Sequence, residues 1–250
     1  MNEETAVNIL REVKNILDDC GIRYWLDYGG LLGAVRDGKF IPWDHDIDFS
    51  LLYPDAMKLL DAIPKFKKKG FFVKVHCNNI TFFRDDIGVN IAAYQSGCSE
   101  YFHINYPAMT YFQDTIRVFY DFACYRHYPS MEARAAFALA YLFACFIPTR
   151  WLSRNISFLL WKVLNGLPFG YAVPKHFFDK LDTIKFYGMT FNIPSSVDDY
   201  LTFKYGNWRV PQRKWDISND DGAIVKGKEF RKRFGRWYLL RDLIKGKVKL

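Results

Sequence analysis

The spacing of apolar residues along the first part of the chain predicts helices and strands in alternation. Residues 3–19 place apolar side chains every three or four positions, which predicts an amphipathic helix, and Gly21 marks its end. Ile22–Tyr28 is rich in aromatic and β-branched residues and predicts a strand that ends at Gly29-Gly30. Leu31–Arg36 then predicts a short helix.

The next strand has one polar and one apolar face. In Asp46–Leu52 polar and apolar residues alternate strictly. Because side chains two positions apart on a strand share a face, the polar face carries Asp46, Asp48 and Ser50. The other face carries three large hydrophobic residues and is expected to join the core.

The remaining pattern continues this mixture of elements. Helices are predicted over Asp55–Lys69, 131–164 and Pro174–Leu181, and from a capping box at Ser195-Ser196 and Asp198-Asp199 to a stop near Gly206. Strands are predicted over Phe71–His76, Asn79–Arg84, Gly88–Tyr94 and 99–125, with a turn at Asp85-Asp86 and a hairpin over Lys185–Asn192 around Gly188.

These elements predict an α/β (α+β) protein with one catalytic body in three parts. Residues 1–130 form the catalytic core, and residues 131–170 form a helical hairpin insertion. Residues 171–250 complete the catalytic domain and end in a basic segment.

Composition and charge narrow the class of protein. Half of the 250 residues are hydrophobic and 18% are aromatic, which excludes a disordered or collagen-like chain. Residues 201–250 hold 14 Lys and Arg against 5 Asp and Glu, whereas the residues before them are close to neutral. A basic end favours an anionic partner.

The cysteines and the start of the chain favour a cytoplasmic protein. The five cysteines are widely spaced and include no C-x-x-C pair, which argues against a zinc site or a disulfide framework. The first residues include Glu3 and Glu4 and do not follow the pattern of a signal peptide.

Two apolar stretches, Ala135–Ile147 and Trp151–Leu164, raise the question of a membrane. The first has 13 residues, fewer than the ~20 that a bilayer-spanning helix needs, and charged residues interrupt the second. Two interpretations stay open: a buried helical hairpin, or a hairpin that lies in a membrane interface. With the basic end, the second would make the protein peripheral on an anionic membrane surface.

The candidate chemistry lies within residues 24–48. A strand that runs into Gly29-Gly30 and a helix lets backbone amides approach a ligand closely, and the start of a helix binds phosphate. Asp46 and Asp48, ~7 Å apart along one strand face, can converge on divalent cations. Mg²⁺ or Mn²⁺ is favoured by carboxylates and substrate phosphates. Arg36 and Lys39 lie between these elements and could neutralise phosphate oxygens.

Each of these features alone has an ordinary explanation. A glycine pair after a strand is commonly a turn, acidic residues are common on exposed strands, and Arg36 alone would be a solvated helix residue. However, the strand, glycine pair, helix, loop and paired carboxylates occur in order within 25 residues. This order favours metal-dependent phosphate chemistry.

Two strings of residues resemble a known family. The first is Tyr28-Gly29-Gly30-Leu31-Leu32-Gly33-Ala34-Val35-Arg36 followed by Phe40-Ile41-Pro42-Trp43-Asp44-His45-Asp46-Ile47-Asp48. The second comprises Ile193-Pro194, Asp199-Tyr200-Leu201, Tyr205-Gly206-Asn207-Trp208 and Pro211. Together they resemble the signature of the LicD/fukutin family, and they bracket most of residues 5–212.

The resemblance implies a fold and a reaction. The fold would be a polymerase-β-like nucleotidyltransferase core with a mixed sheet and a helical insertion. The reaction would place a phospho-alcohol on a glycan hydroxyl and release CMP from a CDP-activated alcohol such as CDP-choline, CDP-ribitol or CDP-glycerol. The implied cofactor is Mg²⁺ or Mn²⁺. The implied partners are the CDP-activated small alcohol and a glycan or lipid-linked saccharide, with no nucleic acid.

The resemblance also implies roles for individual residues. It assigns catalysis to Asp46, Asp48 and Asn90, and metal binding to Asp46 and Asp48. The residues assigned to substrate binding are Gly29, Gly30, Leu31, Arg36, Lys39 and Asp44.

Two positions depart from the family pattern. His45 interrupts an acidic triplet and is expected on the opposite strand face from Asp46 and Asp48. Asn90 stands where the family usually has a third carboxylate, and an amide oxygen can bind a metal but cannot act as a general base. Either Asn90 is a weak ligand, or Asp86 or Asp121 takes over, or a different alignment applies.

Three other functions compete with this one. A glycosyltransferase could use Asp-x-Asp to hold Mn²⁺ on a nucleotide sugar, but its motif normally follows several β-α units. A degenerate homologue could have lost catalysis with the third carboxylate, although Asp46 and Asp48 are intact. Nucleic-acid binding through the basic end lacks a recognisable module.

Overall fold

A mixed sheet organises the part of the chain that the computed structural model describes, which is residues 1–76, 79–105, 169–217, 219–226, 229 and 232–233. Its helices are α1 (Glu3–Asp19), α2 (Tyr28–Arg36), α3 (Tyr53–Lys68), α8 (His176–Asp179) and α9 (Val197–Tyr205). Its strands are β1 (Tyr24–Leu26), β2 (Asp46–Leu52), β3 (Phe72–His76), β4 (Asn79–Arg84), β5 (Ile87–Ser96), β6 (Glu100–Asn105), β7 (Phe169–Pro174), β8 (Leu181–Phe186), β9 (Met189–Pro194) and β10 (Ile224–Lys226).

The centre of the sheet is the parallel pair of β2 and β5, in which Asp48 lies opposite Asn90. β1 pairs with β2, and β4 and then β3 follow β5, all in antiparallel register. The end of β5 continues into β6, β7 and β10. The predicted mixed sheet of an α/β fold is therefore present.

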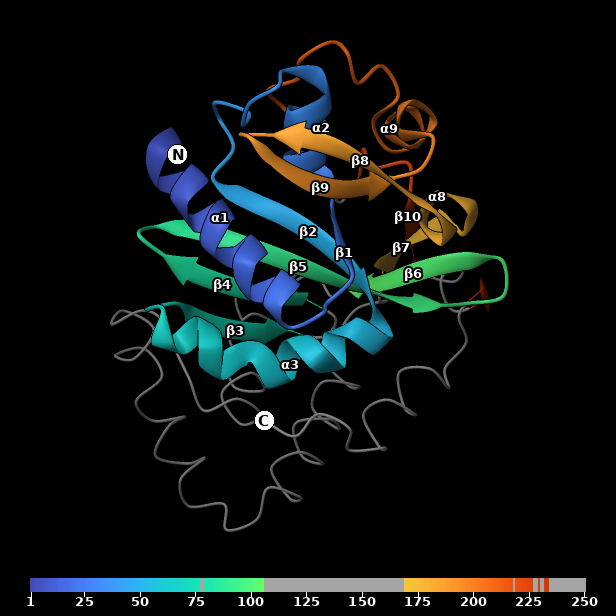
Figure 1. The fold of residues 1–250 in the computed structure, drawn as a ribbon. Helices are drawn as coiled ribbons and strands as arrows, with labels where there is room; N and C mark the ends of the chain where they lie inside the picture. Colours follow the sequence, from blue (N-terminus) through green and yellow to red (C-terminus); the bar gives the residue numbers. More distant parts are fainter. Residues whose placement is uncertain (77–78, 106–168, 218, 227–228, 230–231, 234–250) are drawn as a thin grey trace, which may run out of the picture.

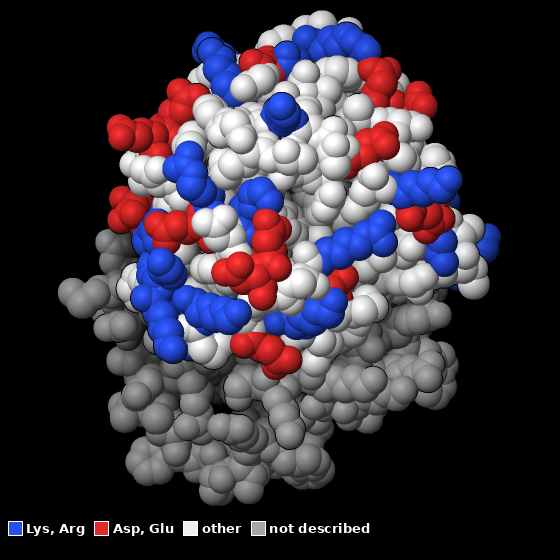
Figure 2. Space-filling model, in the orientation of Figure 1, with Lys and Arg blue, Asp and Glu red and all other residues white. Residues whose placement is uncertain are grey.

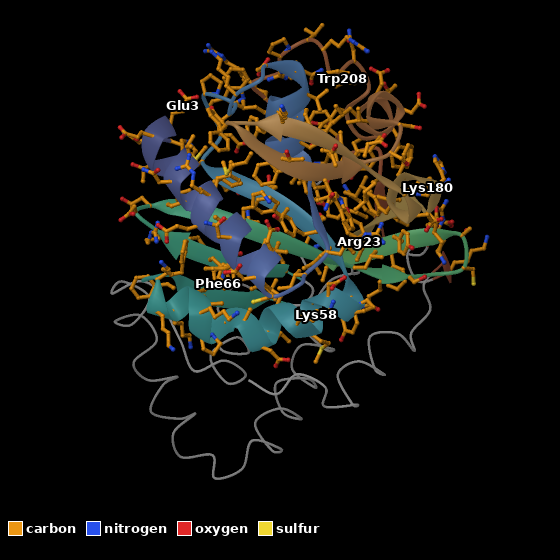
Figure 3. All side chains as sticks on the ribbon, viewed as in Figure 1. Glu3, Arg23, Lys58, Phe66, Lys180 and Trp208 are labelled. Carbon is orange, nitrogen blue, oxygen red and sulfur yellow. The ribbon has the colours of Figure 1, made fainter. Side chains whose placement is uncertain are left out.

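One face of this sheet is buried beneath α1 and α3 (Figure 1). The apolar face of β2 is fully buried, as its alternation predicted. On α3, the ring of Phe66 stacks on Phe82 of β4 with centroids 3.8 Å apart, and Figure 3 shows Phe66 pointing from α3 toward the sheet. Truncating a buried phenylalanine of this kind to alanine costs ~3–5 kcal/mol.

The opposite face of the sheet is covered on one side by the C-terminal part of the chain. Phe178 of α8 packs on Trp25 of β1, with ring centroids 4.5 Å apart, and on Tyr94 of β5 at 5.1 Å. Segments far apart in the sequence therefore meet on the face that carries Asp46 and Asp48.

Several predicted elements agree with the structure. The first helix has its predicted bounds, Glu3–Asp19, and β2 and β4 begin and end at the predicted residues. The turn at Asp85-Asp86 and the hairpin around Gly188 are also present, and the turn residues have positive φ.

The prediction was wrong at the glycine pair. The strand is only Tyr24–Leu26, and Gly29-Gly30 lie inside the first turn of α2. The reason is Asp27, whose carboxylate accepts a hydrogen bond from the amide of Tyr28 at 2.8 Å and caps the helix one turn early.

Two C-terminal details also differ from the prediction. The helix at Pro174–Leu181 is reduced to α8, because β7 and β8 take up its two ends. The helix after Ser196 forms, but Ser196 has a left-handed backbone and makes no side-chain cap. The hydroxyl of Ser195 donates instead to the carbonyl of His176 at 2.9 Å.

The predicted insertion lies outside the described residues. This applies to the helices over Ala135–Ile147 and Trp151–Leu164, and to the part of the 99–125 prediction after Asn105. Within the described ranges, no helix is long and apolar enough to span a bilayer. On the face drawn in Figure 2, basic and acidic side chains are interspersed.

Candidate functional site

Three carboxylates meet at the start of β2. Asp44, Asp46 and Asp48 each bring an oxygen to within 4.8 Å of the other two, and all three are half-buried. The alternation of the strand places Asp46 and Asp48 on one face, and Asp44 joins them from the preceding loop. The sequence predicted the pair as metal ligands but assigned Asp44 to substrate binding.

Burial and mutual repulsion shift the protonation of this cluster. Burial, together with hydrogen bonding to Asp46, raises the pKa of Asp44 to about 7. Burial, followed by the nearby charges of Asp46 and Asp44, raises the pKa of Asp48 well above its ordinary value. Three hard oxygen donors that oppose one another's ionisation fit a divalent cation such as Mg²⁺ or Mn²⁺.

The glycines of α2 make room for this cluster. A side chain at Gly29 would place its Cβ only 2.1 Å from a carboxylate oxygen of Asp44, and one at Gly30 would lie 2.9 Å from the carbonyl oxygen of Asp48. The amide of Gly29 donates to the carboxylate of Asp48 at 3.2 Å. The glycines therefore bring the helix against the acidic strand, and their predicted contact with a phosphate stays a prediction.

Asn90 lies beside the carboxylates, because β5 pairs with β2 and places Asn90 opposite Asp48. Its amide nitrogen donates to Asp46 at 2.6 Å and to Asp48 at 3.2 Å, while its oxygen accepts from the hydroxyl of Thr81 at 2.9 Å. Asn90 thus orients the carboxylates through its donor side, and its oxygen points to Thr81.

Asp86 lies in the exposed turn before β5 and outside the cluster, and Asp121 lies outside the described residues.

A cavity of about 400 Å³ opens above the carboxylates. Arg36 lines it, although its guanidinium is also paired with Asp37 through bonds of 2.8 and 2.9 Å. The structure does not bring Lys39 or Leu31 to this cavity. Lys39 is exposed elsewhere, and Leu31 is fully buried with its amide donating to the carbonyl of Asp27.

One wall of the cavity is aromatic, and the sequence did not predict it as part of the site. The segment after α9 contributes Trp208, Arg213 and Trp215, and the guanidinium of Arg213 lies 5.5 Å from the ring centre of Trp43. Figure 3 shows Trp208 beside α2 and α9. The signal available in the sequence was the density of aromatic and basic residues over 205–215.

A buried ion cluster supports the floor of the cavity. Lys204 of α9 lies 3.3 Å from Asp221 and 3.8 Å from Asp27, and none of these side chains reaches solvent. Asp27 also accepts hydrogen bonds from Ser50 and Tyr200, both at 2.7 Å. Because Asp27 caps α2, this cluster fixes the helix whose glycines contact the carboxylates.

A mixed α/β fold with carboxylates on a central strand, facing the first turn of a glycine-rich helix, defines a nucleotidyltransferase-like domain. Residues 21–137 match the family model described as LicD/FKTN/FKRP, nucleotidyltransferase domain. This match agrees with the resemblance of the motifs to the LicD/fukutin family.

Individual relatives match short stretches. The human and mouse ribitol 5-phosphate transferase FKRP are each 49% identical over 46 residues, which is 18% of this chain and 9% of FKRP. An uncharacterized protein of Rickettsia typhi is 31% identical over 77 residues, 30% of this chain and 25% of the relative. The matches therefore span a quarter or less of these curated relatives.

Among solved structures, the antibiotic-resistance factor ANT(2'')-Ia is similar with a TM-score of 0.34 and 13% identity. The alignment covers 65% of this chain and 96% of that one.

Proposed function

We propose that this chain is a metal-dependent transferase that moves a phospho-alcohol, phosphocholine or a polyol phosphate, from a CDP-activated donor to a glycan hydroxyl. The observation that carries the proposal is the cluster of Asp44, Asp46 and Asp48 at the floor of an aromatic cavity. The family match and the name of FKRP support a transfer of this kind.

The donor fits the cavity by its chemistry. Its diphosphate would lie against the metal held by the three carboxylates, with Arg36 and Arg213 on the walls. Its base would stack on the aromatic wall formed by Trp43, Trp208 and Trp215.

The reaction exchanges one phosphate ester bond for another. The acceptor oxygen forms a bond to the phosphorus that carries the alcohol, the bond from that phosphorus to the CMP oxygen breaks, and the hydroxyl proton passes to solvent. When bound, the metal supplies positive charge for the diphosphate and lowers the pKa of the attacking hydroxyl. Asn90 keeps Asp46 and Asp48 oriented, and it has no basic nitrogen to remove a proton.

The test is a donor panel with two readouts. The purified chain is mixed with Mg²⁺ and CDP-choline, CDP-ribitol, CDP-glycerol or UDP-sugars, and both the melting temperature and the release of CMP are measured. We expect one CDP-alcohol to raise the melting temperature and to release CMP when a glycan is added. Stabilisation by UDP-sugars alone would indicate a glycosyltransferase, and no response to any nucleotide would indicate a degenerate homologue.

The division of the chain and its location complete the proposal. We propose a catalytic core over 1–130, an insertion over 131–170 and a completing part over 171–250.

We also propose a cytoplasmic enzyme that is peripheral on the membrane, where lipid-linked acceptors are found. The described residues of the basic end include seven Lys and Arg: Lys204, Arg209, Arg213, Lys214, Lys226, Lys232 and Arg233. Of these, Arg233 pairs with Glu100 and Glu229. Flotation with anionic liposomes tests the location, and failure of the chain to float would contradict it.

A further inference from the structure

A second cavity, of about 730 Å³, also borders the carboxylates. It shares Asp46 and Asn90 with the first cavity. Along β5, Gly88 lines the second cavity and Ala92 lines the first, while Asn90 between them lines both. The two cavities therefore lie on either side of Asn90 on one face of the sheet.

The second cavity is built on a single row of paired residues. Phe72 of β3 pairs with Phe83 of β4, Phe83 pairs with Gly88 of β5, and Gly88 pairs with Asp46 of β2. Laterally paired residues point to the same face of a sheet. Since Gly88 has no side chain, nothing stands between the aromatic pair and Asp46. A Cβ at Gly88 would lie 3.4 Å from the Phe83 ring and 3.6 Å from the Cβ of Asp46.

The chemistry of this row differs from that of the first cavity. Phe72 is 55% exposed, the largest exposed fraction of any large hydrophobic residue in the described ranges. Asp85 and Asp86, both with left-handed backbone conformation, form the turn at the rim of the second cavity, and both are exposed. An open aromatic surface edged by carboxylates suits a sugar ring, which offers an apolar C–H face and hydroxyl donors.

We infer that the second cavity binds the acceptor saccharide, with its ring on Phe72 and Phe83 and its reactive hydroxyl toward Asp46. The inference rests on the proposed function, because it needs a donor in the first cavity. Attacking and leaving oxygens lie roughly in line across phosphorus during phosphoryl transfer. Two cavities on either side of Asn90 supply such an arrangement, with CMP leaving on the Ala92 side and the acceptor oxygen arriving on the Gly88 side.

Saccharide binding without donor tests this subsite separately. The probes are methyl glycosides of common hexoses and N-acetylhexosamines, detected by saturation-transfer NMR in Mg²⁺ buffer. We expect at least one glycoside to bind wild type, Phe72→Ala to weaken that binding about tenfold, and Phe72→Tyr to retain it. Val73→Ala is the matched control, because Val73 is the neighbouring residue on β3 and faces the opposite side of the sheet.

Each outcome decides between the two proposals. Absence of glycoside binding to wild type, or equal binding to Phe72→Ala, would overturn the acceptor subsite even if a CDP-alcohol still stabilises the protein. Phe72-dependent glycoside binding without any response to CDP-alcohols would support the saccharide site and overturn the proposed donor. Melting curves of each variant verify that it is folded.

Discussion

The two groups of acidic residues around the cavity differ in whether a basic side chain of the protein lies beside them. Asp27 and Asp221 both lie near the buried ammonium of Lys204, so one internal cation offsets part of their charge. In the described part of the chain, no Lys or Arg forms an ion pair with Asp44, Asp46 or Asp48. A group of carboxylates that the protein brings together without a cation of its own is suited to receive one from outside.

This difference distinguishes a cluster that stabilises the fold from a cluster that takes part in the proposed reaction. The Lys204 cluster caps α2 and is fully enclosed, so its loss should damage the fold. The Asp44–Asp48 cluster opens to a cavity and repels itself, so its loss should damage the reaction and spare the fold. Substitutions in the two clusters therefore test directly whether the clusters have these two different roles.

The largest effect is expected from Asp48→Asn. Turnover of the CDP-alcohol should fall at least ~10²-fold, because a metal ligand is lost. The melting temperature should stay the same or rise, since repulsion with Asp46 and Asp44 is relieved. Steady-state CMP release and thermal melting measure the two quantities, with Asp182→Asn on the exposed face of β8 as the control. Near-wild-type activity of Asp48→Asn would refute the metal assignment.

Lys204→Met should have the opposite effect, because it should lower the free energy of unfolding. It leaves Asp27 and Asp221 buried without a cation, which costs ~3–5 kcal/mol of unfolding free energy. Urea denaturation measures this loss. The double variant Lys204→Met with Asp221→Asn should recover part of it, because one uncompensated charge is removed. A single variant as stable as wild type would show that the cluster is not a support.

Asn90→Asp sharpens the comparison by adding a carboxylate to the cluster that has no internal cation. The variant loses the donor that now serves Asp46 and Asp48, so its metal-free form should melt at a lower temperature. Its affinity for Mn²⁺ should rise about tenfold, since affinity grows with ligand charge. Isothermal titration and melting in chelator give both values, and unchanged affinity would place Asn90 outside the metal's reach.

The smallest effect concerns a half-buried acid that is already paired. Glu12 binds Arg84 through two bonds of 2.9 Å, and this hydrogen bonding holds the pKa of Glu12 below its ordinary value. A lowered pKa in the folded state contributes stability above the unfolded pKa, and that contribution disappears as the pH falls through the folded value. Glu12→Gln should therefore cost no more than about 1 kcal/mol at pH 7, and this cost should shrink as the pH falls below the ordinary pKa of a glutamate. A difference that persists in acid would contradict the ionic origin.

Local patterns made much of the N-terminal half predictable. Strict alternation in Asp46–Leu52 located the strand and the face of its carboxylates, and the regular spacing in residues 3–19 located the first helix. The bounds of these elements follow from the spacing of apolar residues alone, and contacts with neighbouring elements do not change them.

The misses arose where tertiary contacts decide the structure. That Gly29 binds a phosphate through its amide stays a prediction, but the sequence did not show that Asp44 lies where a side chain at Gly29 would stand. The aromatic wall of Trp208 and Trp215 follows α9, which docks through buried contacts of Tyr200 and Lys204 with Asp27. No local period encodes such long-range contacts, so the third carboxylate and the far wall required the structure.

The most direct test of the central claim is a titration of Mn²⁺ followed by electron paramagnetic resonance. We expect saturable binding by wild type and by Asp182→Asn, and loss of that binding in Asp46→Asn and Asp48→Asn while both variants remain folded. Equal Mn²⁺ binding by wild type and by these two variants, or none by wild type, would contradict that claim.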